Sequence, residues 1–149
     1  MFWFDKQNPL AVFVDNRESS DKLCDGRAFE VKPDTLADFT NLPFGDRKFK
    51  LVVFDPPHLV NAGETSWLAK KYGVLEDGWE QMMKDGFDEC MRVLDDYGVL
   101  IFKWNETQIS VGRILTAIGR QPLFGHKSGR TNKTHWMCFM KVPERTCDT

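Results

Sequence analysis

The apolar residues of this chain gather into short runs separated by polar stretches rich in turn-forming residues. Runs of this length, rich in β-branched residues and bounded by Asp, Asn, Gly or Pro, predict buried strands. The polar stretch before Lys32 shows no such pattern. We expect the last two predicted strands to form an antiparallel hairpin, because a Gly-containing basic loop joins them. The predicted strands are residues 10–14, 33–39, 50–54, 99–104, 122–127 and 134–141.

Two other segments show helical spacing instead. Between residues 78 and 95, apolar side chains recur every three or four residues, which predicts an amphipathic helix. A second helix is expected to begin at Asn105, which can cap it with Gln108 in a capping-box position, and to end near Ile118. Glycines and charges interrupt every period at 59–77, so we expect a long loop there.

Strands that alternate with helices predict an α/β fold. We expect a Rossmann-like, mostly parallel sheet that helices cover on both faces and that the C-terminal antiparallel hairpin closes. The chain has 149 residues and no linker-like or repetitive stretch, so we expect one domain spanning 1–149. Ligands of such sheets gather where the parallel strands end. Three predicted strands run into an acid at that edge, namely Asp15, Asp38 and Asp55.

The composition is that of an ordinary globular protein, with 42% hydrophobic and 28% charged residues. The four cysteines form no CxxC pair and the three histidines lack metal-ligand spacing, which favours reduced thiols and no metal site. No apolar run is as long as a membrane span and no signal peptide opens the chain, so we expect a cytoplasmic protein without a membrane partner.

The formal net charge of −2 hides an uneven distribution. Residues 1–102 carry 12 basic and 19 acidic side chains, whereas residues 103–149 carry 8 basic and 3 acidic ones. An acidic N-terminal part followed by a basic C-terminal part favours one surface that meets an anionic partner. Chance segregation of solvated charges is the alternative.

The strongest local motif is the Asp-Pro-Pro-His segment that follows the strand at 50–54. Two prolines end the strand, fix the backbone and remove donors, so carbonyls stand beside the Asp55 carboxylate as acceptors. Such acceptors suit a planar NH₂ group, whose hydrogens Asp55 and the Pro56 carbonyl would hold while the flat ring of His58 stacks on a base. A simple strand-terminating turn is the alternative, because Pro-Pro is common in loops.

This segment resembles the fourth motif of class I S-adenosylmethionine-dependent methyltransferases that modify exocyclic amino groups. There Asp, Asn or Ser precedes Pro-Pro and an aromatic residue; His58 departs from the usual Tyr, Phe or Trp but keeps a flat ring. The likeness extends over residues 10–141 and is to small bacterial or bacteriophage DNA methyltransferases. Further stretches carry the same likeness. Residues 37–44 and 49–55 resemble the family's run from the third strand into the fourth. Residues 87–94 and 98–104 resemble its next helix and its fifth strand.

The resemblance implies a role for each matching position. Asp15 would accept hydrogen bonds from the ribose hydroxyls of S-adenosylmethionine, and Asp38 would bind its adenine amino group, with Phe39 packing on the ring. Capping or solvent exposure is the alternative for both acids. The implied catalytic residues, of which the first also borders the cofactor, are Asp55, Pro56, Pro57 and His58.

Basic and aromatic residues follow these motifs and are expected to meet the substrate. Lys103 and Trp104 end the fifth strand on the substrate side, although Trp104 suits the core equally well. Side chains that would reach phosphates from the hairpin loop are Lys127, Arg130 and Lys133. The loop after His58 carries further residues suited to a nucleobase and phosphate, or to a solvated connector: Trp67, Lys70, Lys71 and Tyr72.

The expected reaction is methyl transfer to an exocyclic amine, with adenine N6 in DNA first and the target base flipped out of the duplex. The sequence leaves open a methyltransferase that acts on RNA, protein or a small amine, and a non-catalytic remnant that binds nucleic acid or a partner protein. Before Asp15 we find no Gly-rich loop of the kind that follows the family's first strand, so we expect a shortened fold that lacks this strand. The oligomeric state stays open.

Overall fold

The structure is a computed structural model that describes residues 3–22, 26–60 and 73–143. The chain divides into two compact units, Met1–Pro43 and Phe44–Thr149, which we name the N-terminal unit and the C-terminal unit. In the described segments no helix combines the length and the apolar composition that crossing a membrane requires.

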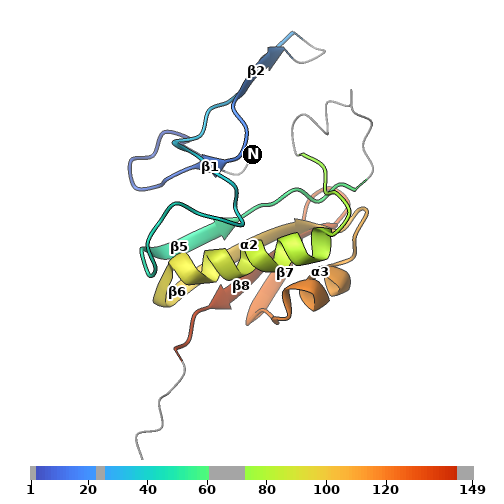
Figure 1. The fold of residues 1–149 in the computed structure, drawn as a ribbon. Coiled ribbons are helices and arrows are strands. Elements are labelled where there is room, and N and C mark those ends of the chain that lie inside the picture. Colours follow the sequence, from blue (N-terminus) through green and yellow to red (C-terminus); the bar gives the residue numbers. More distant parts are fainter. Residues whose placement is uncertain (1–2, 23–25, 61–72, 144–149) are drawn as a thin grey trace, which may run out of the picture. The chain divides into compact units, whose positions relative to one another are not determined.

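The N-terminal unit contains two sheets of two strands each (blue to cyan in Figure 1). β1 (Val14–Asp15) runs parallel to β4 (Thr35–Leu36), and β2 (Ser19–Lys22) pairs antiparallel with β3 (Ala28–Val31). The strand predicted at 10–14 is therefore wrong except at its last residue, and Leu10 is exposed. The β2–β3 ribbon lies in the polar stretch before Lys32, where the sequence predicts no strand. The pattern gives no strand signal there, because every residue of β2 is exposed and apolar and polar residues do not alternate along it.

The C-terminal unit is built on a four-stranded sheet with the order β5-β6-β8-β7. Its strands are β5 (Phe49–Phe54), β6 (Leu94–Asn105), β7 (Phe124–Ser128) and β8 (Thr134–Met140). β5 and β6 run parallel, whereas β8 is antiparallel to both of its neighbours. The fold is thus mixed α/β with the predicted C-terminal hairpin, but the expectation of a mostly parallel sheet is wrong, because β8 lies between β6 and β7 and is antiparallel to both. A crossover helix connects the parallel strands β5 and β6.

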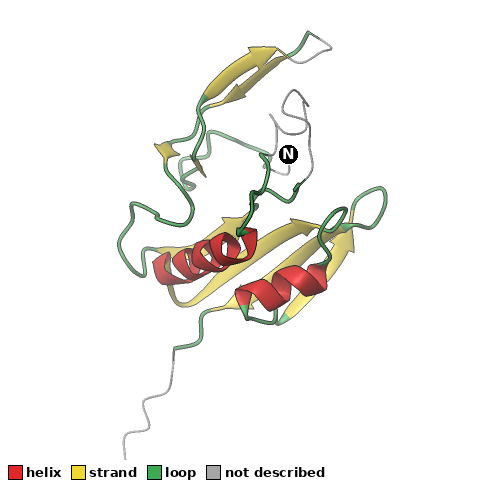
Figure 2. Cartoon of the chain, turned by 45° about the vertical axis from the view of Figure 1, so that its right-hand side comes forward, coloured by secondary structure: helices red, strands yellow, loops and turns green. Residues whose placement is uncertain are grey.

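That crossover helix is α2 (Trp79–Val93), which confirms the helix predicted from spacing. The second helix, α3 (Val111–Ile118), begins later than predicted: Ser110 caps it by accepting from the Arg113 backbone N–H. The Asn105 side chain instead accepts from the backbone N–H and hydroxyl of Thr107. Figures 1 and 2 show α2 and α3 on the same face of the sheet, so the expectation of helices on both faces is wrong for the described part of the chain.

Alternation along β6 separates the two faces of this sheet. Leu100, Phe102 and Trp104 point to the helix side and are almost completely buried. Phe102 contacts the rings of Phe54 and Phe87, with centroids 5.2 and 6.3 Å away. This aromatic core fixes β5 against β6 and therefore fixes the residues at their carboxyl ends.

Candidate functional site

Asp55 and Lys103 meet at the carboxyl edge of the parallel β5–β6 pair. β5 ends at Phe54, which is in register with Phe102, so the next residue of each strand comes side by side. Lys103 Nζ lies 3.0 Å from Oδ1 and 2.9 Å from Oδ2 of Asp55. The ammonium group therefore bridges both carboxylate oxygens, in an ion pair that joins positions 48 apart in the sequence. The predicted catalytic acid and a predicted substrate-side lysine are in direct contact.

The prolines fix the backbone directly after Asp55. Pro56 is buried and Pro57 is half-buried, so this segment is held by packing as well as by its fixed φ angles. The next apolar residue, Leu59, is also buried. The segment after Asp55 is thus a supported part of the C-terminal unit, as an acceptor of fixed geometry requires.

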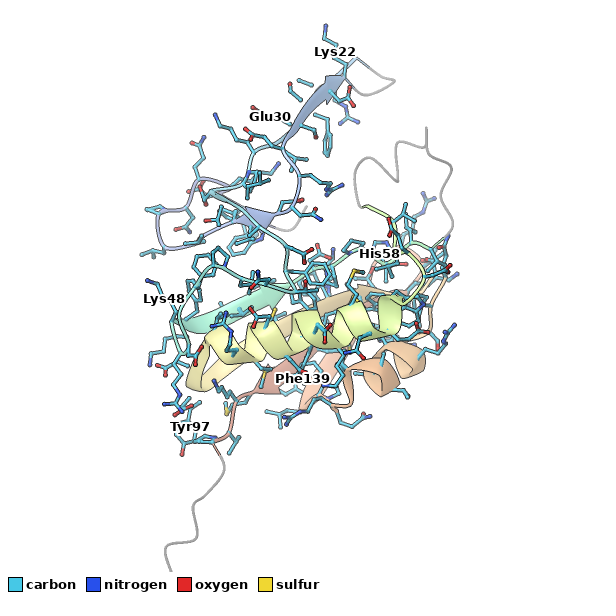
Figure 3. The ribbon with its side chains drawn as sticks, viewed as in Figure 1. Lys22, Glu30, Lys48, His58, Tyr97 and Phe139 are labelled. Carbon is cyan, nitrogen blue, oxygen red and sulfur yellow. The ribbon has the colours of Figure 1, made fainter. Side chains whose placement is uncertain are left out.

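His58 lies at this same end of the sheet, away from Lys48 and Tyr97 at the other end (Figure 3). Its ring stands edge-on to Trp104, with ring centroids 6.3 Å apart. Burial lowers the pKa of His58 below its usual value; Lys103 acts in the same direction, while Asp55 and a hydrogen bond to the Pro56 backbone oppose the shift. The imidazole is therefore neutral at neutral pH, and it provides a flat, uncharged ring beside the Asp55 carboxylate.

Trp104 is only 1% exposed, so the structure places it in the core, the second of the two roles that its position allows. Its indole N–H donates to the Ile109 carbonyl, 3.0 Å away. The half-buried aromatic residue beside Lys103 is instead Trp136, on the neighbouring strand β8. Trp136 in β8 is opposite Lys103, whose Nζ lies 5.8 Å from the indole centroid, and its ring N–H donates to Ser128 Oγ.

Glu106 organises a second cluster that the sequence analysis does not anticipate. Its Oε1 lies 2.8 Å from His135 Nε2 and 3.4 Å from Lys127 Nζ, and its Oε2 accepts from the Val111 backbone N–H. These contacts, chiefly the one with His135, lower the pKa of Glu106 to about 2. The only sequence signal is an acid that directly follows a strand end, the same signal that marks Asp55.

The predicted phosphate-binding residues lie in or beside the β7–β8 turn, and all three are exposed: Lys127, Arg130 and Lys133. Lys127 reaches back to Glu106, whose backbone N–H donates to the Lys133 carbonyl. The turn is therefore attached to the end of β6. A basic loop of this kind lies at the strand end that carries Asp55 and Lys103.

The acids predicted to hold a cofactor lie in the N-terminal unit. Asp15 ends β1, and Asp38 follows the parallel neighbour β4, so both stand at the carboxyl edge of one two-stranded sheet. Arg17 contacts both carboxylate oxygens of Asp15, at 3.1 and 3.2 Å. Asp38 Oδ1 accepts from the backbone N–H and hydroxyl of Thr40. Phe39 is half-buried.

The carboxylates of Asp15 and Asp38 offer hydrogen-bond acceptors. Two carboxylates at the edge of a parallel strand pair can accept from ribose hydroxyls and from an adenine amino group. Both hydrogen bonds from Thr40 use the same oxygen of Asp38, whereas a ribose hydroxyl at Asp15 would share the carboxylate with Arg17. Asp38 is therefore the better placed acceptor of the two.

Across residues 3–22, 26–60 and 73–143, no group of three or more His, Cys, Asp or Glu side chains is arranged to hold a metal ion. No model of a protein family matches this chain, and no curated protein matches it either. The predicted substrate residues Trp67, Lys70, Lys71 and Tyr72 lie outside the described residues.

Proposed function

We propose that this protein is an S-adenosylmethionine-dependent methyltransferase that acts on an exocyclic amino group, with adenine N6 in DNA as the first substrate. The observation that carries the proposal is the position of Asp55: a carboxylate at the carboxyl end of a parallel strand, followed by a rigid Pro-Pro segment and the flat ring of His58. A methyltransferase of this type needs little more at the acceptor amine, because the methyl donor is already activated.

The finer fold that we propose is a class I methyltransferase sheet. In support, β5 and β6 are parallel and α2 connects them, as the resemblance implies for the fourth and fifth strands. The antiparallel β7–β8 hairpin agrees with the expected closing element. In the N-terminal unit, the parallel pair of β1 and β4 suits the second and third strands.

The residues around Asp55 would orient the amine. One N–H of the NH₂ group donates to the Asp55 carboxylate and the other to the Pro56 carbonyl, so the nitrogen lone pair points away from both acceptors. A carbonyl oxygen accepts two hydrogen bonds, so the contact of Pro56 with His58 leaves this role open. The His58 ring can stack on the base. Orientation of this kind raises the rate by holding the reacting atoms in line.

Residues of the N-terminal unit would hold the cofactor. Asp38 accepts from the adenine amino group, Phe39 packs on the adenine ring, and Asp15 accepts from the ribose hydroxyls. When bound, S-adenosylmethionine supplies an electrophilic methyl group on a positively charged sulfur.

Exposed basic residues would bind the nucleic-acid backbone. Arg130 and Lys133 in the β7–β8 turn are suited to phosphate contacts, and such contacts position a strand without reading its sequence. A base in duplex DNA would have to leave the stack to reach Asp55.

The test is methyl transfer from tritiated S-adenosylmethionine to a panel of DNA, RNA and protein. We expect incorporation into adenine-containing DNA, and a loss of at least about 100-fold in Asp55→Ala, because both the acceptor and its charge are removed. Asp95→Ala is the matched control, since Asp95 also forms an ion pair with a lysine, Lys50. Methylation that survives Asp55→Ala would reject the proposed role of this residue.

The exposed basic turn also supports a second candidate, a non-catalytic protein that binds nucleic acid. That function predicts DNA binding that depends steeply on salt and is unaffected by Asp55→Ala or by the cofactor. The two candidate functions therefore predict different results for Asp55→Ala: a methyltransferase loses methyl transfer, whereas a non-catalytic protein keeps its DNA affinity. A change of DNA affinity with the cofactor would favour the methyltransferase.

A further inference from the structure

The ion pair between Asp55 and Lys103 determines the charge of the proposed amine site. The Lys103 ammonium touches both oxygens of the Asp55 carboxylate, and the two side chains are 22% and 38% exposed. The contact is thus partly shielded from water on the lysine side. A carboxylate in such a pair keeps its hydrogen-bond acceptors but has little net charge to offer a second cation.

Lys103 is held in this position from two sides. Its strand, β6, is central in the sheet between β5 and β8, and Lys103 itself is in register with Trp136 of β8. Its ammonium group also lies over the Trp136 ring, 5.8 Å from the centroid. Trp136 is itself oriented by its hydrogen bond to Ser128 Oγ, 2.8 Å away. The Lys103 side chain is therefore held between Asp55, which follows β5, and Trp136 in β8.

We propose that Lys103 makes the Asp55 site selective for neutral aromatic amines, such as the amino group of a nucleobase, over protonated alkylamines. This inference rests on the proposed function, since it takes Asp55 as the group that binds the acceptor amine. It names the substrate class among the alternatives that the sequence leaves open: nucleobases, and neither lysine side chains nor polyamines.

The hydrogen-bond capacity of the carboxylate supports this selectivity. Two carboxylate oxygens offer about four lone-pair sites, and the contacts with Lys103 use one on each oxygen. A neutral NH₂ group can donate to a remaining site without displacing the lysine. A protonated alkylamine at the same carboxylate would stand next to the Lys103 ammonium, and the two like charges repel. For a partly exposed pair, we expect this repulsion to weaken cation binding about tenfold.

The test compares two small probes that need no cofactor. Dissociation constants for 2′-deoxyadenosine, whose amine is neutral, and for 1,4-diaminobutane, a dication, are measured by NMR titration of the amide signals near Asp55. In the unmodified chain we expect the dication to bind at least about tenfold more weakly than the nucleoside. In Lys103→Met we expect its affinity to rise about tenfold, because the unpaired carboxylate now attracts cations.

Two further variants separate charge from structure. Lys50→Met removes a lysine that also pairs with an aspartate, Asp95, and should leave the preference unchanged. Lys103→Arg keeps the positive charge and should retain the preference, so the test stands even if Lys103→Met unfolds. Equal binding of both probes to the unmodified chain, a preference that Lys103→Met leaves intact, or no binding of either probe near Asp55 would overturn the inference. A preference for the nucleoside without any methyl transfer would instead reject the proposed function and leave the inference standing.

Discussion

The two units place carboxylates at strand ends in similar ways but support them differently. In the C-terminal unit, Asp55 is fixed by a lysine 48 positions away, on strands that a buried aromatic core holds together. In the N-terminal unit, the carboxylates of Asp15 and Asp38 accept hydrogen bonds from residues two positions along the chain, Arg17 and Thr40. No described residue up to position 43 is buried, whereas 22 described residues of the C-terminal unit are.

This difference indicates which of the candidate site residues depend on tertiary structure for their orientation. Local turns are enough to orient Asp15 and Asp38, since their partners are neighbours in the sequence. The Asp55–Lys103 pair exists only if β5 and β6 pair in the observed register. Two-stranded sheets without a buried face are marginal on their own, so we expect the C-terminal unit to provide most of the folding free energy.

The largest expected effect comes from removing one phenylalanine in each unit. Phe102→Ala deletes a fully buried ring that packs on Phe54 and Phe87, and we expect it to lower the free energy of unfolding by about 3–5 kcal/mol. Phe13→Ala removes a half-buried ring that contacts Trp3, and we expect about 1 kcal/mol. Urea denaturation of both variants checks this. Equal losses would contradict the claimed difference between the units.

The next effect concerns the close packing of the hairpin. A Cβ atom added at Gly125 would lie 2.8 Å from the Trp136 carbonyl oxygen, so Gly125→Ala should separate β7 from β8 and cost about 1–3 kcal/mol. Gly45→Ala is the control, because nothing lies within 4 Å of its added Cβ. Thermal unfolding of the two variants measures the difference. A Gly125→Ala protein as stable as the control would mean that the hairpin is loosely paired.

A smaller effect is expected at Glu106. Its pKa is about 2 in the folded chain against an ordinary value of 4.5, so its contribution to stability is complete above about pH 4.5 and is lost as the pH falls towards 2. Glu106→Gln should therefore lower the free energy of unfolding by about 1 kcal/mol at pH 7 and by almost nothing at pH 2. Urea denaturation across this range, with Glu76→Gln as the exposed control, checks the sign. A constant difference at all pH values would contradict the assigned ionisation.

The sequence predicts well where pattern and packing agree. The apolar run at 50–54 and the helical spacing from Trp79 to Val93 correspond to β5 and α2, because both elements are selected by burial. The helix cap is wrong, since Asn105 and Ser110 are equally good caps by composition. Only the tertiary position of β6, which extends as far as Asn105, decides between them.

The candidate site was predictable only in part. Asp55, Pro56 and His58 follow from a local motif, and the structure adds Lys103 as the direct partner of Asp55. The contacts of Trp136 and Glu106 depend on which strand pairs with β6, and no spacing in the sequence encodes that pairing. For the same reason, the sequence does not predict that β8 and β7 make the sheet mostly antiparallel.

The measurement that tests the account most directly is calorimetric titration of the chain with S-adenosylmethionine. We expect saturable heat from the unmodified chain and affinity at least about tenfold weaker in Asp38→Asn, because the adenine amino group loses a charged acceptor. Asp21→Asn, an exposed acid in β2 of the same unit, should bind like the unmodified chain. No heat at millimolar ligand would contradict the claim that this chain works as a methyltransferase on its own.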